Sequence, residues 1–213
     1  MSLAPEPARN CPLCPRLVAY RARNAAENPD WFNGPAPSFG DPRARLLVVG
    51  LAPGRTGANR TGRPFTGDYA GDLLYGTLLK YGFASGIYRA DPADGLTLSG
   101  AMISNAVRCA PPENKPTPVE IATCNGFLAA RMAALPELRA IIALGRIAHD
   151  AALKALGERP GRFAFAHGAE HPLPGGRVLI DSYHCSRYNT QTRRLTEAMF
   201  HAVFDRAHSL CDG

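Results

Sequence analysis

Short runs of apolar residues, separated by loops and amphipathic segments, recur along the chain. The first run, Leu46 to Gly50, has no polar side chain, which is typical of a strand buried on both faces of a parallel sheet. Further strands are expected at Ala101 to Val107, Leu138 to Leu144 and Val178 to Asp181. Because helical patterns follow these strands, the chain is predicted to form a mainly parallel sheet covered by helices.

Helices are predicted where apolar side chains repeat every three or four positions. The segment that begins at Thr117 has a hydroxyl cap, a proline in its first turn and Glu120 three residues after the cap. This helix is expected to continue to about Leu135. Three further helices are expected, over Asp72 to Phe83, Ile147 to Leu156 and from near Thr190 onward.

A glycine-rich and arginine-rich loop, GLAPGRTGANRTGRPFTGD at 50–68, follows the first strand. Such turns often bind phosphate groups through backbone N–H groups. Gly57 and Gly62 have the G-x-x-x-x-G spacing of a nucleoside-triphosphate loop. However, Arg63 stands where that motif needs lysine, and Pro64 where it needs a hydroxyl, so a triphosphate site is disfavoured.

Three loops are expected to meet at one edge of the sheet, because ligand sites in such folds lie at the C-terminal ends of the strands. These loops contribute an aromatic ring (Phe65), a carboxylate (Asp68), an amide (Asn105) and an imidazole (His184). Each of these residues alone has common structural roles. Together they suit a pocket that binds a planar base.

Composition narrows the class of protein. The 213 residues contain no internal repeat or linker, so a single domain over 1–213 is expected. A formal net charge of +6 favours an anionic partner such as nucleic acid, although a basic protein without such a partner has the same composition. No apolar stretch approaches the roughly 18 residues of a membrane span, and the first residues lack a secretion signal. We therefore expect a cytoplasmic protein with no membrane partner.

Six cysteines in such a protein point to metal or redox chemistry rather than to disulfides. Cys11 and Cys14 form a C-x-x-C pair, and Cys109 and Cys124 lie far downstream. Four thiolates suit either zinc or an iron–sulfur cluster, and the spacing does not choose between them. Alternatively, the downstream pair are ordinary buried thiols.

Three long motifs resemble those of the type-B, or family-5, uracil-DNA glycosylases. The first is GLAPG at 50–54 together with 57–68, and the second is SNAVRC at 104–109 together with PPENKP at 111–116. The third is SYHCS at 182–186, followed by Asn189 and Thr190. The resemblance runs in order from Cys11 to about the final helix, which is nearly the whole chain.

This resemblance implies a three-layer α/β/α sandwich with a central four-stranded parallel sheet. It implies a [4Fe–4S] cluster on the cysteines that match the family's ligands, which are Cys11, Cys14, Cys109 and Cys124. It also implies a monofunctional DNA-repair enzyme that flips uracil, and other deaminated or damaged bases, out of DNA. Hydrolysis of the N-glycosidic bond would leave an abasic site. A nucleoid-associated monomer is expected.

The resemblance and the chemistry assign roles to the residues of the crevice. Phe65 is expected to stack on the flipped base, Asn105 to bind its Watson–Crick edge, and His184 to donate to its carbonyl as negative charge develops. Asp68 is expected either to position water or stabilise the sugar cation, or only to cap the following helix. The residues expected to contact DNA are Arg55, Asn59, Arg60, Arg63, Ser186, Arg187 and Asn189.

Some positions are informative because they lack a polar group or depart from the family pattern. Leu51 and Ala52 follow the glycine of the first strand, where many relatives in the wider superfamily carry an acidic or amide side chain. They are expected to line an open pocket that accepts several bases. Arg55-Thr56 replaces a common alanine–histidine pair, Arg193 a glycine, and Cys185 a proline.

Two other classes of function are weighed against this enzyme. One is a non-catalytic or covalently trapping uracil-DNA-binding protein on the same fold. Such relatives carry a basic, histidine-bearing insertion after the first motif, and none is present between Gly62 and Gly71. The other is a zinc-stabilised enzyme acting on small nucleotides, which the absence of a phosphate motif disfavours.

Overall fold

A computed structural model describes residues 5–212 of the chain. Its helices are α1 (Pro15–Glu27), α2 (Ala58–Thr61), α3 (Tyr69–Lys80), α4 (Pro118–Ala133), α5 (Arg146–Ala155), α6 (Arg187–Gln191) and α7 (Glu197–Asp212), with short 3-10 turns η1 (Pro112–Asn114) and η2 (Pro160–Arg162). Its strands are β1 (Phe39–Gly40), β2 (Leu46–Gly50), β3 (Ala84–Ser85), β4 (Thr97–Leu98), β5 (Ala101–Asn105), β6 (Ala140–Leu144), β7 (Glu170–Leu173) and β8 (Arg177–Ser182).

The main sheet has the strand order β1-β5-β2-β6-β8-β7. Its four inner strands are parallel to one another, and these are the four strands predicted from the sequence. The short edge strands β1 and β7 run antiparallel and were not predicted, and neither was the separate β3–β4 hairpin. The sheet therefore has six strands around the expected parallel core.

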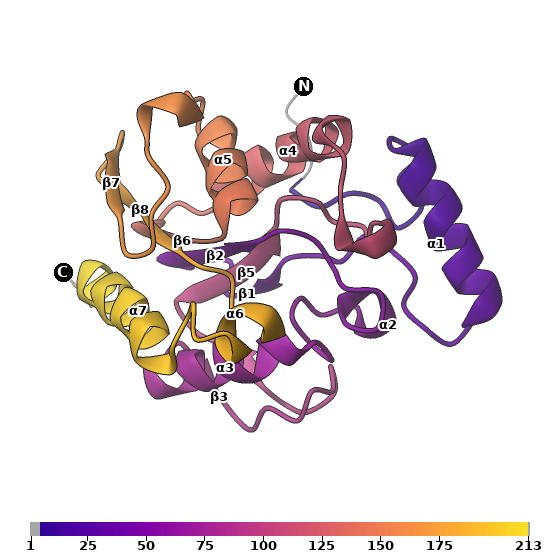
Figure 1. The fold of residues 1–213 in the computed structure, drawn as a ribbon, viewed down its shortest axis with the longest axis horizontal. Helices are drawn as coiled ribbons and strands as arrows, with labels where there is room; N and C mark the ends of the chain where they lie inside the picture. The colour runs from indigo at the N-terminus through magenta and orange to yellow at the C-terminus, as the bar shows by residue number, and fades with distance from the viewer. Residues whose placement is uncertain (1–4, 213) are drawn as a thin grey trace.

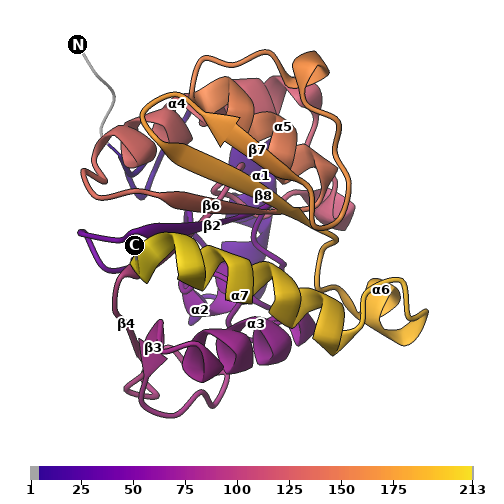
Figure 2. The same cartoon turned by 90° about the vertical axis from the view of Figure 1, so that its left-hand side faces the viewer.

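Helices cover both faces of this sheet, so the predicted three-layer sandwich is confirmed (Figures 1 and 2). Side chains alternate along β2, with Leu46 and Val48 on one face and Leu47 and Val49 on the other. The first face packs against α3 and α7, and the second against α4 and α5.

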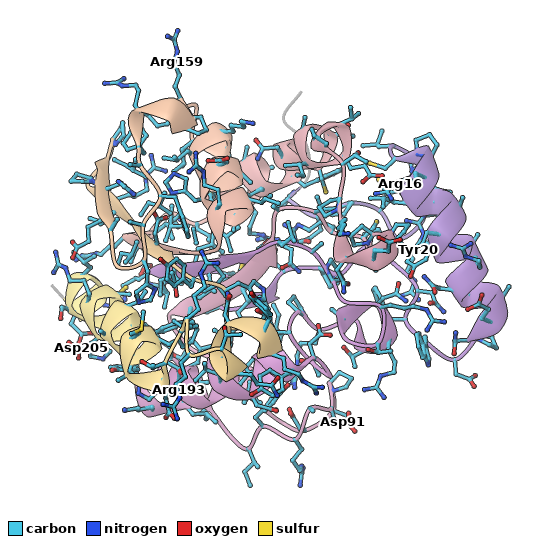
Figure 3. The ribbon with its side chains drawn as sticks, in the orientation of Figure 1. Arg16, Tyr20, Asp91, Arg159, Arg193 and Asp205 are labelled. Carbon is cyan, nitrogen blue, oxygen red and sulfur yellow. The ribbon has the colours of Figure 1, made fainter. Side chains whose placement is uncertain are left out.

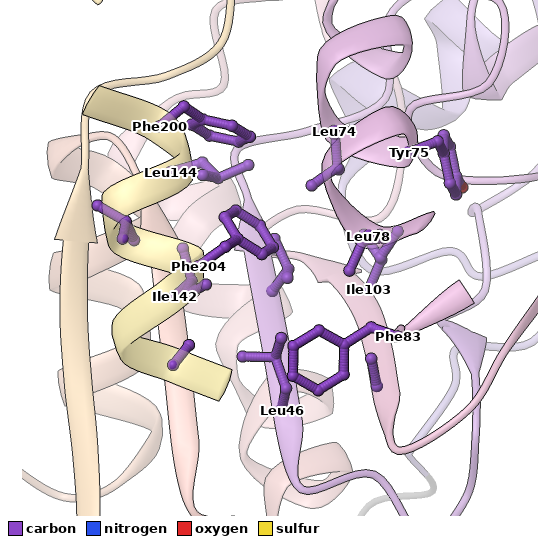
Figure 4. Packing of buried hydrophobic residues seen from close by; sticks show 14 of the residues in the cluster. Leu46, Leu74, Tyr75, Leu78, Phe83, Ile103, Ile142, Leu144, Phe200 and Phe204 are labelled. Carbon is purple, nitrogen blue, oxygen red and sulfur yellow. The ribbon is translucent and has the colours of Figure 1, made fainter. Parts of the chain in front are cut away.

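Aromatic and aliphatic side chains fill the layer between the sheet and the α3–α7 pair. Figure 4 shows Phe200 and Phe204 of α7 beside Leu74 and Leu78 of α3, over side chains of the strands. Among the described residues, no helix is both long enough and apolar enough to cross a membrane.

The prediction of one continuous helix from near Thr190 is wrong. The chain forms α6, leaves the helical path after Gln191 and begins α7 six residues later, at Glu197. Arg193 lies between them with a φ of 57°, a left-handed conformation that cannot continue a right-handed helix. By contrast, α4 begins as predicted, with a complete capping box between Thr117 and Glu120.

Candidate functional site

A cleft of about 420 Å³ opens at the C-terminal ends of the parallel strands. The loops after β2, β5 and β8 meet there, as the sequence predicted. The cleft is lined by Leu51, Ala52, Gly54, Phe65, Asp68, Tyr69, Ala70, Asn105, Asn114, His184, Ser186 and Arg187. This set includes all six residues that were expected to bind the base or take part in the chemistry, although their individual roles stay predictions.

An aromatic ring and an imidazole form one wall of the cleft. The rings of Phe65 and His184 lie roughly parallel, with centroids 6.0 Å apart and planes inclined by 26°. Phe65 has a φ of 56°, a left-handed conformation that a bulky residue rarely adopts and that turns its ring back toward β2. A Cβ atom at Gly50 would lie 2.6 Å from that ring, so a side chain at this position would displace the ring.

Two polar atoms in the cleft lack a hydrogen-bond partner within the described part of the chain. They are the Asn105 side-chain oxygen and His184 Nδ1, and both are buried. A buried polar atom without a partner costs about 1–3 kcal/mol. These two atoms are therefore free to form hydrogen bonds with a polar ligand or with water in the cleft.

The titration behaviour of the cleft follows from its burial. Burial lowers the pKa of His184 to about 4, so the imidazole is neutral near pH 7 and can donate one N–H without bringing a charge. Burial raises the pKa of Asp68, while a hydrogen bond from the Gly54 backbone and the charge of Arg60 oppose that rise.

Asp68 occupies the first cap position of α3, but its side chain makes no capping hydrogen bond. The carboxylate instead rests against the backbone of Gly54 and Gly57, where a Cβ on either glycine would overlap it. The sequence alternative in which Asp68 only caps the helix is therefore wrong. The lack of a side chain at Gly54 and Gly57 leaves room for this carboxylate beside the cleft.

Two residues predicted to contact DNA are buried. Arg63 is 5% exposed, and its guanidinium donates to both oxygens of Asp94 at 2.8 Å. Asn59 is 1% exposed and donates to Asn33 Oδ1 at 3.1 Å. The expectation that these two side chains meet phosphates is wrong, because both satisfy their hydrogen bonds inside the protein.

The other five predicted DNA contacts lie at or near the surface. Arg60 and Arg187 are exposed, whereas Arg55 is half-exposed and already paired with Glu27 at 2.8 Å. Ser186 and Asn189 each form a hydrogen bond within the protein. The Ser186 hydroxyl caps α6, and the Asn189 amide donates to the His184 backbone oxygen at 2.8 Å.

Sequence reasoning missed two polar residues of the cleft. Tyr69 begins α3 and has the guanidinium of Arg187 5.0 Å from its ring centre. Asn114 follows Glu113 in η1, and both residues have left-handed φ angles near 55°. The PPENKP motif pointed to this turn, but only the fold shows that it bends Asn114 into the cleft.

The four cysteines predicted to bind metal surround one apolar site beside the sheet. Cys11 and Cys14 precede α1, Cys109 follows β5, and Cys124 lies in α4. All four line a single small cavity and pack with Leu17, Val107 and Phe127. Burial raises the pKa of Cys109 to about 12 and that of Cys124 to about 11, so both are neutral thiols unless a metal binds them.

The separation of the sulfur atoms bears on the choice that spacing left open. Within residues 5–212, no three cysteine sulfurs lie within 4.8 Å of one another. One tetrahedral zinc ion would hold its thiolates about 3.8 Å apart. Any three of these sulfurs therefore include a pair that is farther apart than two ligands of one zinc ion would be, and the iron–sulfur cluster stays a prediction.

Basic residues and an ion pair tie this cysteine site together. Arg21 Nη1 lies 3.5 Å from Cys109 Sγ, and the Arg108 backbone N–H donates to Cys124 Sγ at 3.3 Å. Arg16 of α1, labelled in Figure 3, donates to both carboxylate oxygens of Glu120 in α4. Hydrogen bonds to the sulfurs are typical of iron–sulfur sites.

His149, His171 and Asp181 form another group of possible metal ligands, and all three are buried or nearly so. The two histidines contact opposite oxygens of Asp181 at 2.7 and 2.9 Å. Ligands of one tetrahedral ion would be about 3.3 Å apart. These are hydrogen-bond distances, and the group anchors β8 to α5 and β7.

Comparison with known proteins identifies the family of this chain. Residues 37–208 match the family model of the uracil DNA glycosylase superfamily. A type-5 uracil-DNA glycosylase of Thermus thermophilus is 50% identical over 205 residues, which cover 94% of this chain and 93% of that protein. Type-5 enzymes of Mycobacterium tuberculosis and Pyrobaculum aerophilum are 42% and 41% identical, over 94% and 93% of this chain and 78% and 88% of theirs.

A type-4 uracil-DNA glycosylase of Pyrobaculum aerophilum is also similar, at 32% identity over 75% of this chain and 68% of its own. The identity to type-5 proteins is higher and extends over nearly the full chain. The sequence motifs, the fold and these comparisons agree, and the chain belongs to the type-5 uracil-DNA glycosylases of the uracil-DNA glycosylase superfamily.

Proposed function

We propose that this protein removes uracil from DNA by hydrolysing the N-glycosidic bond and leaves an abasic site. The observation that carries this proposal is the pair of unpartnered polar atoms, on Asn105 and His184, beside the Phe65 ring. An aromatic face with polar groups at its edge matches what a flipped pyrimidine offers. The similarity to proteins named type-5 uracil-DNA glycosylases supports the same activity.

Phe65 and Asn105 bind the base in the cleft. Stacking on Phe65 replaces the stacking that the base loses when it leaves the duplex. The Asn105 amide then pairs with the Watson–Crick edge, and its unpartnered oxygen accepts the N–H of a uracil ring. The partner that the site requires is thus uracil-containing DNA.

Departure of the base is assisted by His184. As the glycosidic bond breaks, negative charge collects on the base and positive charge on the sugar. A neutral imidazole that already faces the base can donate to its carbonyl oxygen, and this bond strengthens in the transition state. The pKa of His184, lowered to about 4, keeps the imidazole from binding the substrate as a cation.

Asp68 acts on the sugar side of the bond. Gly54 and Gly57 hold its carboxylate at the cleft, and no capping hydrogen bond engages it. In its ionised form it stabilises the cationic sugar and orients the attacking water. Arg60 lies near enough to favour that ionised form.

The four cysteines suit a [4Fe–4S] cluster. When bound, such a cluster supplies four iron atoms that crosslink the thiolates of Cys11, Cys14, Cys109 and Cys124. Among these residues, the first pair belongs to the start of α1 and the others to the segments after β5 and in α4. We propose that the cluster is structural, because this connection fixes the chain that follows β5.

DNA is proposed to cross the open edge of the cleft. Arg60 and Arg187 are exposed beside it and are available to phosphates, whereas Arg55 must first exchange its partner Glu27. We further propose that residues 1–213 act as one domain and as a monomer. A protein of this activity works where the cell keeps its DNA, in the cytoplasm and at the nucleoid.

A wider choice of bases is proposed from the side chains at the pocket entrance. Leu51 and Ala52 line the cleft without a hydrogen-bonding side chain. A pocket discriminates strongly between bases when a wrong base leaves its polar groups without hydrogen bonds. Leu51 and Ala52 provide no such groups, so discrimination against other bases is weaker. Release of hypoxanthine as well as uracil is therefore expected.

The experiment is a single-turnover assay with saturating enzyme on matched duplexes that contain uracil, hypoxanthine or no lesion. His184→Ala should slow release of both bases by about 10²–10³-fold while duplex binding stays within about threefold. The absorption spectrum of the protein as isolated reports the cluster. Binding without base release by the wild-type protein would instead support the non-catalytic binder, and release of uracil alone would refute the open-pocket argument.

A further inference from the structure

Strand β8 leads directly into the His184 turn, and its antiparallel pairing continues to residues that precede the start of β7. The Asp181 N–H donates to the Ala169 carbonyl at 2.9 Å, and the Gly168 N–H donates to the Asp181 carbonyl at 2.8 Å. The next hydrogen bond of this ladder would engage the Tyr183 N–H, one residue before His184.

A side chain makes that hydrogen bond. The Tyr183 N–H donates to His167 Nδ1 at 3.1 Å, where an ordinary ladder would use a main-chain carbonyl. The His167 ring also stacks on the Tyr183 ring, with centroids 5.1 Å apart and planes inclined by 27°. His167 therefore holds both the main chain and the side chain of the residue that precedes His184.

This arrangement requires an unprotonated Nδ1, since two N–H groups cannot share one hydrogen bond. Burial lowers the pKa of His167, while a hydrogen bond with the Met199 backbone opposes the shift. The charged groups around the ring are Glu170 of β7 and Arg206 of α7, which pair with each other at 2.9 Å. On the Tyr183 side, the Arg194 guanidinium lies 4.7 Å from the ring centre.

The strand below is anchored independently of His167. Asp181 is bound by His149 from α5 and by His171 from β7. Loss of the His167 contact would consequently free the Tyr183 main chain, while β8 stays in the sheet and Asn189 still binds the His184 carbonyl.

We propose that His167 is a positioning residue for His184, and that its neutral imidazole fixes the main chain from which the His184 ring projects. This inference rests on the proposed function, in which His184 contacts the leaving base. Protonation of His167 removes the acceptor at Nδ1 and loosens the turn, so base release declines as His167 becomes protonated in acid.

Three variants test this role. They distinguish the hydrogen-bond acceptor that His167 provides from the ability of its ring to be protonated. His167→Asn places an amide oxygen near the position of Nδ1 and cannot titrate, whereas His167→Leu removes the acceptor. His208→Asn is the matched control, because His208 pairs with Asp212 near the C-terminal end of α7. Single-turnover rates are measured from pH 5 to 8 on the uracil duplex, with melting temperature and duplex binding recorded for each variant.

The expected results differ between the variants. His167→Leu should slow base release about tenfold at pH 7.5 with duplex binding unchanged, as for the loss of one positioning hydrogen bond. His167→Asn should stay within about threefold of wild type at pH 7.5 and lose the acid decline. His208→Asn should match the wild type throughout. A His167→Asn profile that overlays the wild-type profile would overturn the proposal, even if the leucine variant fails to fold.

An NMR measurement, which does not depend on enzyme activity, tests this proposal separately from the proposed function. In wild-type protein, the NMR resonance of the Tyr183 amide should follow the titration of the His167 ring, with the neutral ring protonated at Nε2. If the wild-type protein releases no base, the proposed function fails while this titration still supports the His167 contact. A Tyr183 amide that does not respond to His167 overturns the inference in either case.

Discussion

Replacement of Arg63 by alanine should destabilise the protein without weakening its hold on DNA phosphates. The Arg63 and Asp94 side chains are 5% and 0% exposed, and two hydrogen bonds of 2.8 Å join them. The guanidinium also lies 5.3 Å from the ring centres of Phe39 and Tyr75. Asp94 in turn accepts from the backbone N–H groups of Arg89 and Leu96, so the pair connects two loops beside the cleft.

The magnitude follows from the charge left behind. Removal of one partner of a buried ion pair costs about 3–5 kcal/mol, because the other charge stays buried and uncompensated. For a protein of this size, that loss lowers the melting temperature by roughly 6–20 °C. Arg63 holds the pKa of Asp94 well below its ordinary value, so this stability is present above about pH 4 and is lost as the pH falls further.

The assay compares thermal melting at pH 7.5 with the salt dependence of duplex binding, in Arg63→Ala and in the exposed Arg60→Ala. Arg63→Ala should melt earlier and keep the wild-type salt slope. Arg60→Ala should melt normally and reduce the slope by about one log–log unit, as for one lost phosphate contact. If Arg63→Ala melted within about 2 °C of wild type and lowered the slope, the reasoning from burial would be refuted.

Three further predictions concern the cluster, the carboxylate and the imidazole. Cys14→Ser should lose both its iron, measured by absorption, and its solubility. A soluble, active, iron-free protein would contradict a structural cluster. Gly57→Ala places a methyl group on the Asp68 carboxylate and should slow single-turnover base release about 10²-fold. The control Gly76→Ala meets no atom within 4 Å and should retain wild-type activity, and equal rates in the two variants would exclude the glycine cradle. Because burial lowers the pKa of His184 to about 4, stability should fall as pH decreases from about 6.5 to about 4. His184→Ala should flatten the melting temperature over that window, and an unchanged profile would show that the imidazole is not buried as described.

Local sequence patterns predicted the central elements of the fold because those elements depend on local chemistry. The run Leu46 to Gly50 forms β2 with the predicted bounds, and Thr117 caps α4 through the predicted box. The edge strands β1 and β7 have only two and four residues. They exist because a neighbouring strand offers free backbone groups, which no local pattern reveals. The end of the chain was predicted as one helix because its periodicity does not report the left-handed turn at Arg193.

For the site, the sequence by itself determined which chemical groups would meet. Phe65, Asp68, Asn105 and His184 follow the ends of parallel strands, and chain direction in such a sheet brings strand ends to one edge. Motifs of this length also identified the family that the comparisons confirm.

Only the tertiary structure decided which of these groups face solvent, ligand or protein. Arg60 and Arg63 lie three positions apart in the same basic loop, yet one is exposed and the other is paired with Asp94, thirty-one residues away. The Asp68 carboxylate leaves the helix end it could have capped, because Gly54 and Gly57 open a space beside the cleft. His167 lies far from the His184 turn in the sequence. It contacts the Tyr183 N–H because the fold brings its loop to the end of β8. Burial and hydrogen-bond partners depend on contacts between segments that are distant in the sequence. The sequence therefore shows which chemical groups are present but not the environment of each one.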